Sequence, residues 1–142
     1  MMLSEHFSLA EMVVSQTAAR KGLDNTPGPG TVENLKALAA TLEKVRAILG
    51  HPIHISSGYR SIAVNRAIGG VGTSAHCLGH ACDFIAPGFG SPLEVCRAIA
   101  ASDLKFDQLI EEGTWVHLSV DPRMRRQVLT MRGGKYTPGL SG

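Results

Sequence analysis

The chain has 142 residues, the length of one ordinary domain, so we expect a single domain over residues 1–142. Apolar residues make up 44% and charged residues 18%, a balance typical of globular proteins. The formal net charge is +2, and the lysines and arginines are scattered, which excludes the basic stripe of a nucleic-acid binder.

The cysteines and the N-terminus bear on where the protein works. Cys77, Cys82 and Cys96 are an odd set without CxxC spacing, which is typical of free thiols in a reducing compartment. No apolar run approaches the roughly 18 residues of a membrane span, so we expect no membrane insertion. "MMLSEHFSLAEMVV" lacks the basic start and apolar core of a signal peptide. We therefore expect cytoplasmic synthesis, with another component releasing the protein if it acts elsewhere.

The first third of the chain is expected to be helical. "FSLAEMVVSQTAARKG" predicts one helix, with Ser8 and Glu11 at capping-box spacing and Gly22 at its end. After a loop dense in turn residues, Thr31 is expected to cap a second helix that stops at Gly50. Apolar residues at steps of three and four make this a core helix: Leu35, Leu38, Leu42, Val45 and Leu49.

The middle of the chain mixes short strands and helices. "HPIHISS" and "ACDFIA" predict strands, "SIAVNRAI" predicts a short helix, and "GGVGTS" predicts a flexible loop. Ser91, Pro92 and Glu94 form the strongest helix start in the sequence, and that helix is expected to run to about Ser102.

Consecutive strands close the sequence. "FDQLIEE", "TWVHLSV" and "QVLTMR" predict three strands, the first two joined near Gly113. Because consecutive strands favour antiparallel pairing, we predict an α+β fold with a small antiparallel sheet and flanking helices. The folded core should cover about residues 5–132, and residues 133–142 are expected to be a frayed tail.

The strand "TWVHLSV" places its side chains on two faces. Alternation puts the valines and Leu118 on a core face, and Trp115, His117 and Ser119 on a face that suits a groove. A lone histidine of this kind is more often a satisfied or exposed side chain than a ligand. Taken alone, His117 therefore marks a candidate position only.

The run "SAHCLGHACDF" contains the other candidate ligands. His76 and Asp83 lie seven residues apart, with His80 as the obvious competitor. Two histidines and one carboxylate suit a catalytic zinc ion, because three protein ligands leave one position open for water. Cys77 and Cys82 neighbour His76 and Asp83 in the sequence, so strand-like geometry would turn both thiols away, and we interpret them as small buried apolar residues.

Several motifs together resemble a known family. "SSGYRS", Asn65, the glycine pair 69–70, "SAHCLGHACDF", "FDQLIEE" and "WVHLS" occur in the order found in the zinc D-alanyl-D-alanine carboxypeptidases, whose fold is shared with the hedgehog signalling domain. The opening "HFSLAEMVVSQTAARKGLDNTP" also resembles the phage and prophage branch, whose members cut peptidoglycan peptides. The resemblance covers roughly residues 5–121. It implies a hedgehog/DD-peptidase-like fold.

The resemblance implies a ligand set. It makes His76, Asp83 and His117 the zinc ligands, and it places His80 on a position that varies in the family. Gly79 and Ala81 match small positions between the ligands, where bulk would crowd the backbone around the metal.

The resemblance also implies residues that bind substrate. Arg60 matches an arginine that binds substrate and polarises its carbonyl, a role that suits a fixed, always charged guanidinium. Ser74 matches the motif serine and is expected to line the site, although loop chemistry alone would explain it equally well. Trp115 is expected to wall the groove, with a structural role as the alternative.

The general base is less defined. Better-known branches carry an acid three positions before the last ligand histidine, but here that position is Thr114. In the phage-like branch a glutamate follows the "FDQLI" segment, which favours Glu112, with Asp107 and Glu111 as alternatives. Its task would be to take a proton from the attacking water and deliver it to the leaving group.

The function implied by the resemblance is zinc-dependent cleavage of peptidoglycan stem peptides. A D-alanyl-D-alanine carboxypeptidase is the favoured activity, and an L-alanyl-D-glutamate endopeptidase of the endolysin type is a close alternative, because the same metal centre serves both. A third hypothesis is a non-catalytic phage structural or cell-wall-binding module with a retained zinc site. Action at the cell wall after release, or within a phage particle, would fit these activities.

Overall fold

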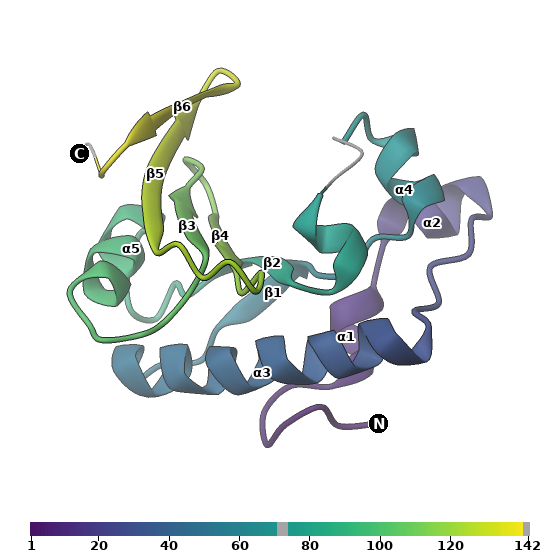
Figure 1. Cartoon of the computed structure of the whole chain (residues 1–142), viewed down its shortest axis with the longest axis horizontal. Coiled ribbons are helices and arrows are strands. Elements are labelled where there is room, and N and C mark those ends of the chain that lie inside the picture. The colour runs from purple at the N-terminus through teal and green to yellow at the C-terminus, as the bar shows by residue number, and fades with distance from the viewer. Residues whose placement is uncertain (71–73, 141–142) are drawn as a thin grey trace.

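The computed structural model describes residues 1–70 and 74–140 (Figure 1). The helices are α1 (Leu9–Val13), α2 (Gln16–Lys21), α3 (Pro29–Leu49), α4 (Ile62–Ala67) and α5 (Pro92–Ala100), with a 3₁₀ helix η1 (Ala75–Leu78). The strands are β1 (His54–Ser57), β2 (Ala81–Ile85), β3 (Gln108–Glu111), β4 (Val116–Ser119), β5 (Gln127–Arg132) and β6 (Lys135–Pro138). The predicted loop "GGVGTS" lies partly outside the described residues, at 71–73.

The strands form a six-stranded sheet in the order β1-β2-β4-β3-β5-β6. All neighbours are antiparallel except β3 and β5. The exception has a simple cause. β4 ends at Ser119, which pairs with Gln108 at the start of β3, and Gln127 at the start of β5 also pairs with Gln108. The short connection thus returns the chain to the beginning of β3, so β5 runs parallel to it. The predicted α+β class is confirmed, with a larger sheet than expected.

One face of the sheet is covered by helices. Figure 1 shows α3 along the bottom of the molecule with the sheet above it, and α5 at the far end from α2 and α4. The predicted apolar stripe of α3 is almost completely buried: Leu35, Leu38, Leu42, Val45 and Leu49. Val116 and Leu118 of β4 are fully buried in the same core, as strand alternation predicted. Among the described residues, no helix is both long and apolar enough to cross a membrane.

Two helix boundaries differ from the prediction. The expected first helix is two short helices, because Val14 is extended and the side chain of Ser15 accepts a hydrogen bond from the Ala18 amide, starting a new helix. The second helix begins at Pro29 with Gly28 as its cap, so Thr31 is not the capping residue. Proline at the first helical position needs no amide partner, which explains the earlier start.

The expected frayed tail was also wrong for part of its length. Lys135–Pro138 forms β6, which pairs with β5 through an antiparallel hairpin. Gly133 and Gly134 have φ values of 57° and 78°, the left-handed conformation that a tight two-residue hairpin turn requires. This glycine pair, which was expected to lie in the frayed tail, is therefore a hairpin turn.

Candidate metal centre

The sheet register brings two of the candidate ligands together. Asp83 of β2 lies directly opposite His117 of β4. Their side chains lie on the same face, with His117 Nδ1 3.0 Å from Asp83 Oδ1. Burial raises the pKa of Asp83, but the hydrogen bonds from His117 and His76 outweigh this effect and hold the pKa well below its usual range.

His76 reaches the same place from a loop. It lies in η1, where the Ser74 side chain caps the helix by accepting a hydrogen bond from the His76 amide. Its Nδ1 is 2.7 Å from the Gly58 carbonyl oxygen, which requires a proton on that nitrogen. In the neutral imidazole the other nitrogen, Nε2, then carries no proton and can act as a ligand atom; it lies 3.4 Å from Asp83 Oδ1. The imidazole is only 3% exposed, so its orientation is fixed.

The geometry of the three side chains fits a metal ion. One ligand atom from each of His76, Asp83 and His117 lies within 4.8 Å of the other two. With zinc bonds of about 2.0–2.2 Å, tetrahedral ligand atoms lie about 3.3–3.6 Å apart, close to the two separations given above. Within residues 1–70 and 74–140, His80 and the cysteines do not belong to this group.

The loop that carries His76 is held by the N-terminal part of the chain. The Tyr59 amide donates to the Met12 carbonyl at 2.7 Å, and a side chain at Gly58 would collide with that carbonyl. Asn25 joins the same parts: its amide donates to the carbonyls of Val13 and Tyr59, and its oxygen accepts from the Ser61 amide. Close packing on α1 thus sets the position of the Gly58 carbonyl that orients His76.

Gly79 has a different role from the one expected. Its φ is +76°, and an added Cβ would lie 2.9 Å from the Thr31 carbonyl oxygen of α3. The glycine allows η1 to end and to pack against α3, rather than leaving room around the metal ligands. Ala81 is fully buried at the start of β2.

Glu112 lies beside the three candidate ligands. It follows β3, and its amide donates to the Trp115 carbonyl across the turn at Gly113, whose φ is +91°. Its Oε2 is 3.9 Å from His117 Nδ1 and accepts a hydrogen bond from Trp115 Nε1 at 3.3 Å. Burial raises the pKa of Glu112, against an opposing effect of His117. The tryptophan therefore orients a carboxylate that favours its protonated form more than a free glutamate does.

The two alternative bases are engaged elsewhere. Glu111 points away from Glu112, with its carboxylate bonded to the Gly113 amide and, at 2.5 Å, to Arg132. Asp107 makes a forked ion pair with Arg125 at 2.8 and 2.9 Å. The Arg125 guanidinium lowers the pKa of Asp107 and keeps it charged. Both carboxylates form an ion pair with an arginine, whereas Glu112 bonds to Trp115 beside the candidate ligands.

Arg60 lies next to His76, one of the three candidate ligands. Its backbone amide donates to the His76 carbonyl at 3.1 Å, and its guanidinium reaches Ser74 Oγ at 3.4 Å. Its Nε is buried and has no hydrogen-bond partner among the described residues. A buried donor without a partner costs free energy, so this guanidinium retains capacity for a ligand oxygen.

These side chains line one cleft of about 660 Å³. It contains all the predicted site residues, namely His76, Asp83, His117, Glu112, Arg60, Ser74 and Trp115. It also contains residues that the sequence analysis did not identify, among them Ile110, Leu129, Arg123 and Tyr136. Arg123 is exposed and pairs with Asp121 at 2.9 Å. The signal for Tyr136 was the Gly-Gly pair before it, which predicts a hairpin rather than a tail.

The comparisons with known proteins identify the family. A family model described as Peptidase M15 matches residues 5–119. The chain belongs to the peptidase M15 family. A search of curated proteins finds no match. The matched segment ends with β4, so it contains the candidate ligands and Glu112, whereas β5 and β6 follow it.

Proposed function

We propose that this protein is a zinc-dependent peptidase that cleaves the stem peptides of bacterial peptidoglycan, with D-alanyl-D-alanine carboxypeptidase as its activity. The observation that supports this most strongly is the convergence of His76, Asp83 and His117, with Glu112 beside them, in a chain of the peptidase M15 family. The opening sequence favours the phage and prophage branch. The substrate would then lie in the cell wall, where the protein acts after release.

The metal would be held by His76 Nε2, Asp83 and His117 Nδ1. A zinc ion in such a site supplies a Lewis acid, which lowers the pKa of water and polarises a carbonyl. The protein's own contribution is to fix the ligand atoms before the ion binds. The Gly58 carbonyl selects the His76 tautomer, and the pairing of β2 with β4 sets the separation of Asp83 and His117.

Glu112 would act as general base and then as general acid. Its carboxylate lies at the edge of the ligand group and is held by Trp115, so it can take a proton from the attacking water. The same oxygen would deliver that proton to the nitrogen of the leaving amino acid. The burial that raises its pKa favours the second half of this cycle.

Arg60 would bind the substrate from the loop side of the cleft. Its guanidinium carries a fixed positive charge and a buried donor without a partner, which suits the carbonyl oxygen or the terminal carboxylate of a peptide. Ser74 positions this guanidinium through its hydroxyl and also caps η1. Trp115 contributes the wall next to Glu112.

The proposal is tested by metal analysis together with cleavage of a synthetic stem pentapeptide that ends in D-alanyl-D-alanine. We expect zinc to copurify and free D-alanine to be released. Glu112→Gln should keep zinc and lose about 10²–10⁴-fold in kcat, the usual contribution of a general base. Glu33→Gln, an exposed glutamate of α3, is the matched control and should behave as the unaltered protein.

Each other result has a distinct meaning. Stems shortened between L-alanine and D-glutamate in purified peptidoglycan would replace the carboxypeptidase assignment by the endopeptidase. Bound zinc without any turnover would show a non-catalytic module. Cleavage that persists after complete removal of the metal would refute the proposal as a whole.

A further inference from the structure

One face of the sheet carries a continuous row of side chains that starts at the candidate metal centre. Asp83 pairs with His117, His117 with Ile110, Ile110 with Leu129, and Leu129 with Pro138. Directly paired residues of neighbouring strands point to the same face. The polar end of the row therefore continues into an apolar floor formed by Ile110, Leu129 and Pro138.

Tyr136 stands on this face, beyond the metal centre. It pairs with Met131, which lies two residues after Leu129 on β5 and so shares its face. Tyr136 is 57% exposed and lines the cleft together with Glu112 and His117. Burial and the charges of Glu112 and Asp83 raise the pKa of its phenol, which agrees with a place close to these carboxylates.

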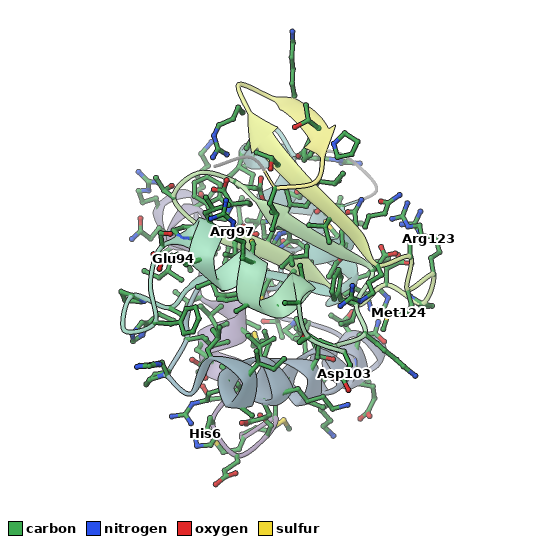
Figure 2. The ribbon with its side chains drawn as sticks, turned by 90° about the vertical axis from the view of Figure 1, so that its left-hand side faces the viewer. His6, Glu94, Arg97, Asp103, Arg123 and Met124 are labelled. Atoms are coloured by element: carbon green, nitrogen blue, oxygen red, sulfur yellow. The ribbon has the colours of Figure 1, made fainter. Side chains whose placement is uncertain are left out.

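The hairpin that carries Tyr136 is anchored firmly beside Glu112. Arg132 of β5 bonds to the buried carboxylate and the carbonyl of Glu111, the residue next to Glu112. Thr130 Oγ1 donates to the Gly139 carbonyl at 2.8 Å and ties down the end of β6. Figure 2 shows this hairpin, in yellow, at the top of the molecule, with His6 at the opposite end. These hydrogen bonds fix the hairpin and thereby give Tyr136 a defined position.

The exposure of this ring is not explained by folding. Among the described residues that line the cleft, Tyr136 and Trp115 are the exposed large aromatic side chains, and Trp115 bonds to Glu112. An aromatic ring on an edge strand that buries so little surface adds little to stability, but it gains free energy when a ligand covers it. Binding sites favour tyrosine and tryptophan for this reason.

We propose that Tyr136 is a substrate-binding residue, whose ring packs against the alkyl part of the stem-peptide residue beside the scissile bond. The β5–β6 hairpin is then a substrate subsite formed outside the segment matched by the family model. The inference rests on the proposed function for the identity of its ligand. It does not require any change in protonation of Tyr136, because the contact is made by the ring.

The sequence provides a built-in reporter for a test. Trp115 is the single tryptophan of the chain and lines the cleft, so its fluorescence should change when a peptide binds. The zinc-loaded full-length protein is titrated with the same stem pentapeptide. Tyr136→Thr removes the ring but keeps a residue with high strand propensity. We expect its Kd and KM to rise about tenfold, with zinc content and Tm unchanged.

Two control variants define what the ring does. Tyr136→Phe keeps the ring and should bind as the unaltered protein does. Lys135→Ala changes the neighbouring exposed residue. Because side chains alternate along a strand, Lys135 points to the opposite face, so this variant should bind the peptide with an unchanged Kd. An unchanged Kd in Tyr136→Thr would overturn the inference, and so would a Tyr136→Phe variant that is as weak as Tyr136→Thr.

Failure of the inference and of the proposed function can be told apart. If the unaltered protein cleaves the peptide but Tyr136→Thr binds it normally, only the inference fails. If the unaltered protein binds without cleaving, the proposed activity fails while the variants still decide the role of the ring. An unaltered protein that neither binds nor cleaves the peptide refutes both.

Discussion

The two walls of the cleft are built by different means. On the sheet wall, Asp83 and His117 face each other because β2 and β4 pair in one register. On the loop wall, Arg60 and His76 owe their places to contacts with residues far away in the sequence, such as Met12. Figure 1 shows that the chain between β1 and α4, which carries Arg60, and η1, which carries His76, lie near α1 and α2 and away from α5.

The two walls should therefore respond differently to amino-acid substitutions. A strand register is fixed by the many buried side chains of the sheet, because a slip of one residue would expose all of them. A loop position depends on a few hydrogen bonds and one close backbone approach. We therefore expect substitutions at the sheet wall to remove a function cleanly, and substitutions that support the loop wall to affect stability and metal affinity together.

The largest effect is expected for Asp83→Ala. It removes a proposed ligand but leaves the backbone pairing of β2 and β4 in place. Zinc affinity should therefore fall by more than roughly 100-fold, the upper range for substitution of a residue that only hydrogen-bonds to a ligand. A competition titration with a chelator measures this affinity. His80→Ala, outside the ligand group, is the matched control, and an equal loss there would show that the site has been misassigned.

Gly58→Ala should affect both properties. The added methyl group collides with the Met12 carbonyl and displaces the Gly58 carbonyl from His76. We expect a loss of about 1–3 kcal/mol in the free energy of unfolding. The misplaced histidine should also lower zinc affinity about 10–100-fold. Thermal unfolding and chelator competition measure the two.

Gly30→Ala is the control for this substitution. Gly30 lies in α3 with open space around its Cβ position, so alanine there should leave zinc binding intact and stabilise the helix slightly. A stable Gly58→Ala variant with normal zinc affinity would contradict the dependence of the loop wall on this close approach.

The same contrast explains what the sequence could predict. Alternation in "TWVHLSV" and the apolar stripe of α3 fix which side faces the core, and both predictions were confirmed. Local signals cannot report contacts such as Gly58 with Met12, because they join segments far apart in the chain. β6 was missed because each of its residues is exposed, so it has no apolar pattern. Tyr136 was missed with it.

Asn25→Ala should have a smaller effect on the loop wall. Asn25 bonds to Val13, Tyr59 and Ser61 but is only half-buried, so water can replace part of these bonds. We expect a loss of about 1 kcal/mol in unfolding free energy, measured by urea denaturation. The released loop should raise KM for the pentapeptide while zinc affinity stays normal, since the Gly58 contact remains. A change in zinc affinity as large as that of Gly58→Ala would show that Asn25, rather than the glycine, sets the position of His76.

The smallest effect is expected where the N-terminus meets α3. Glu43 accepts hydrogen bonds from the Ser4 hydroxyl and from the backbone and ring of His6. Burial raises the pKa of Glu43, but these bonds outweigh it and lower the pKa from 4.5 to about 2. A carboxyl group with a lowered folded-state pKa stabilises the protein above its unfolded pKa and loses this contribution as the pH falls through the folded value.

Glu43→Gln should therefore cost less than about 1 kcal/mol at neutral pH. The difference from the unaltered protein should be complete above pH 4.5 and should vanish as the pH approaches 2. Thermal unfolding across this range measures the difference, with Glu33→Gln as the exposed control. A gap between the two proteins that does not change with pH would mean that Glu43 contributes by packing and not by charge. In that case the N-terminal support of the loop wall would be apolar, and it would rest on buried residues such as Phe7 and Met12.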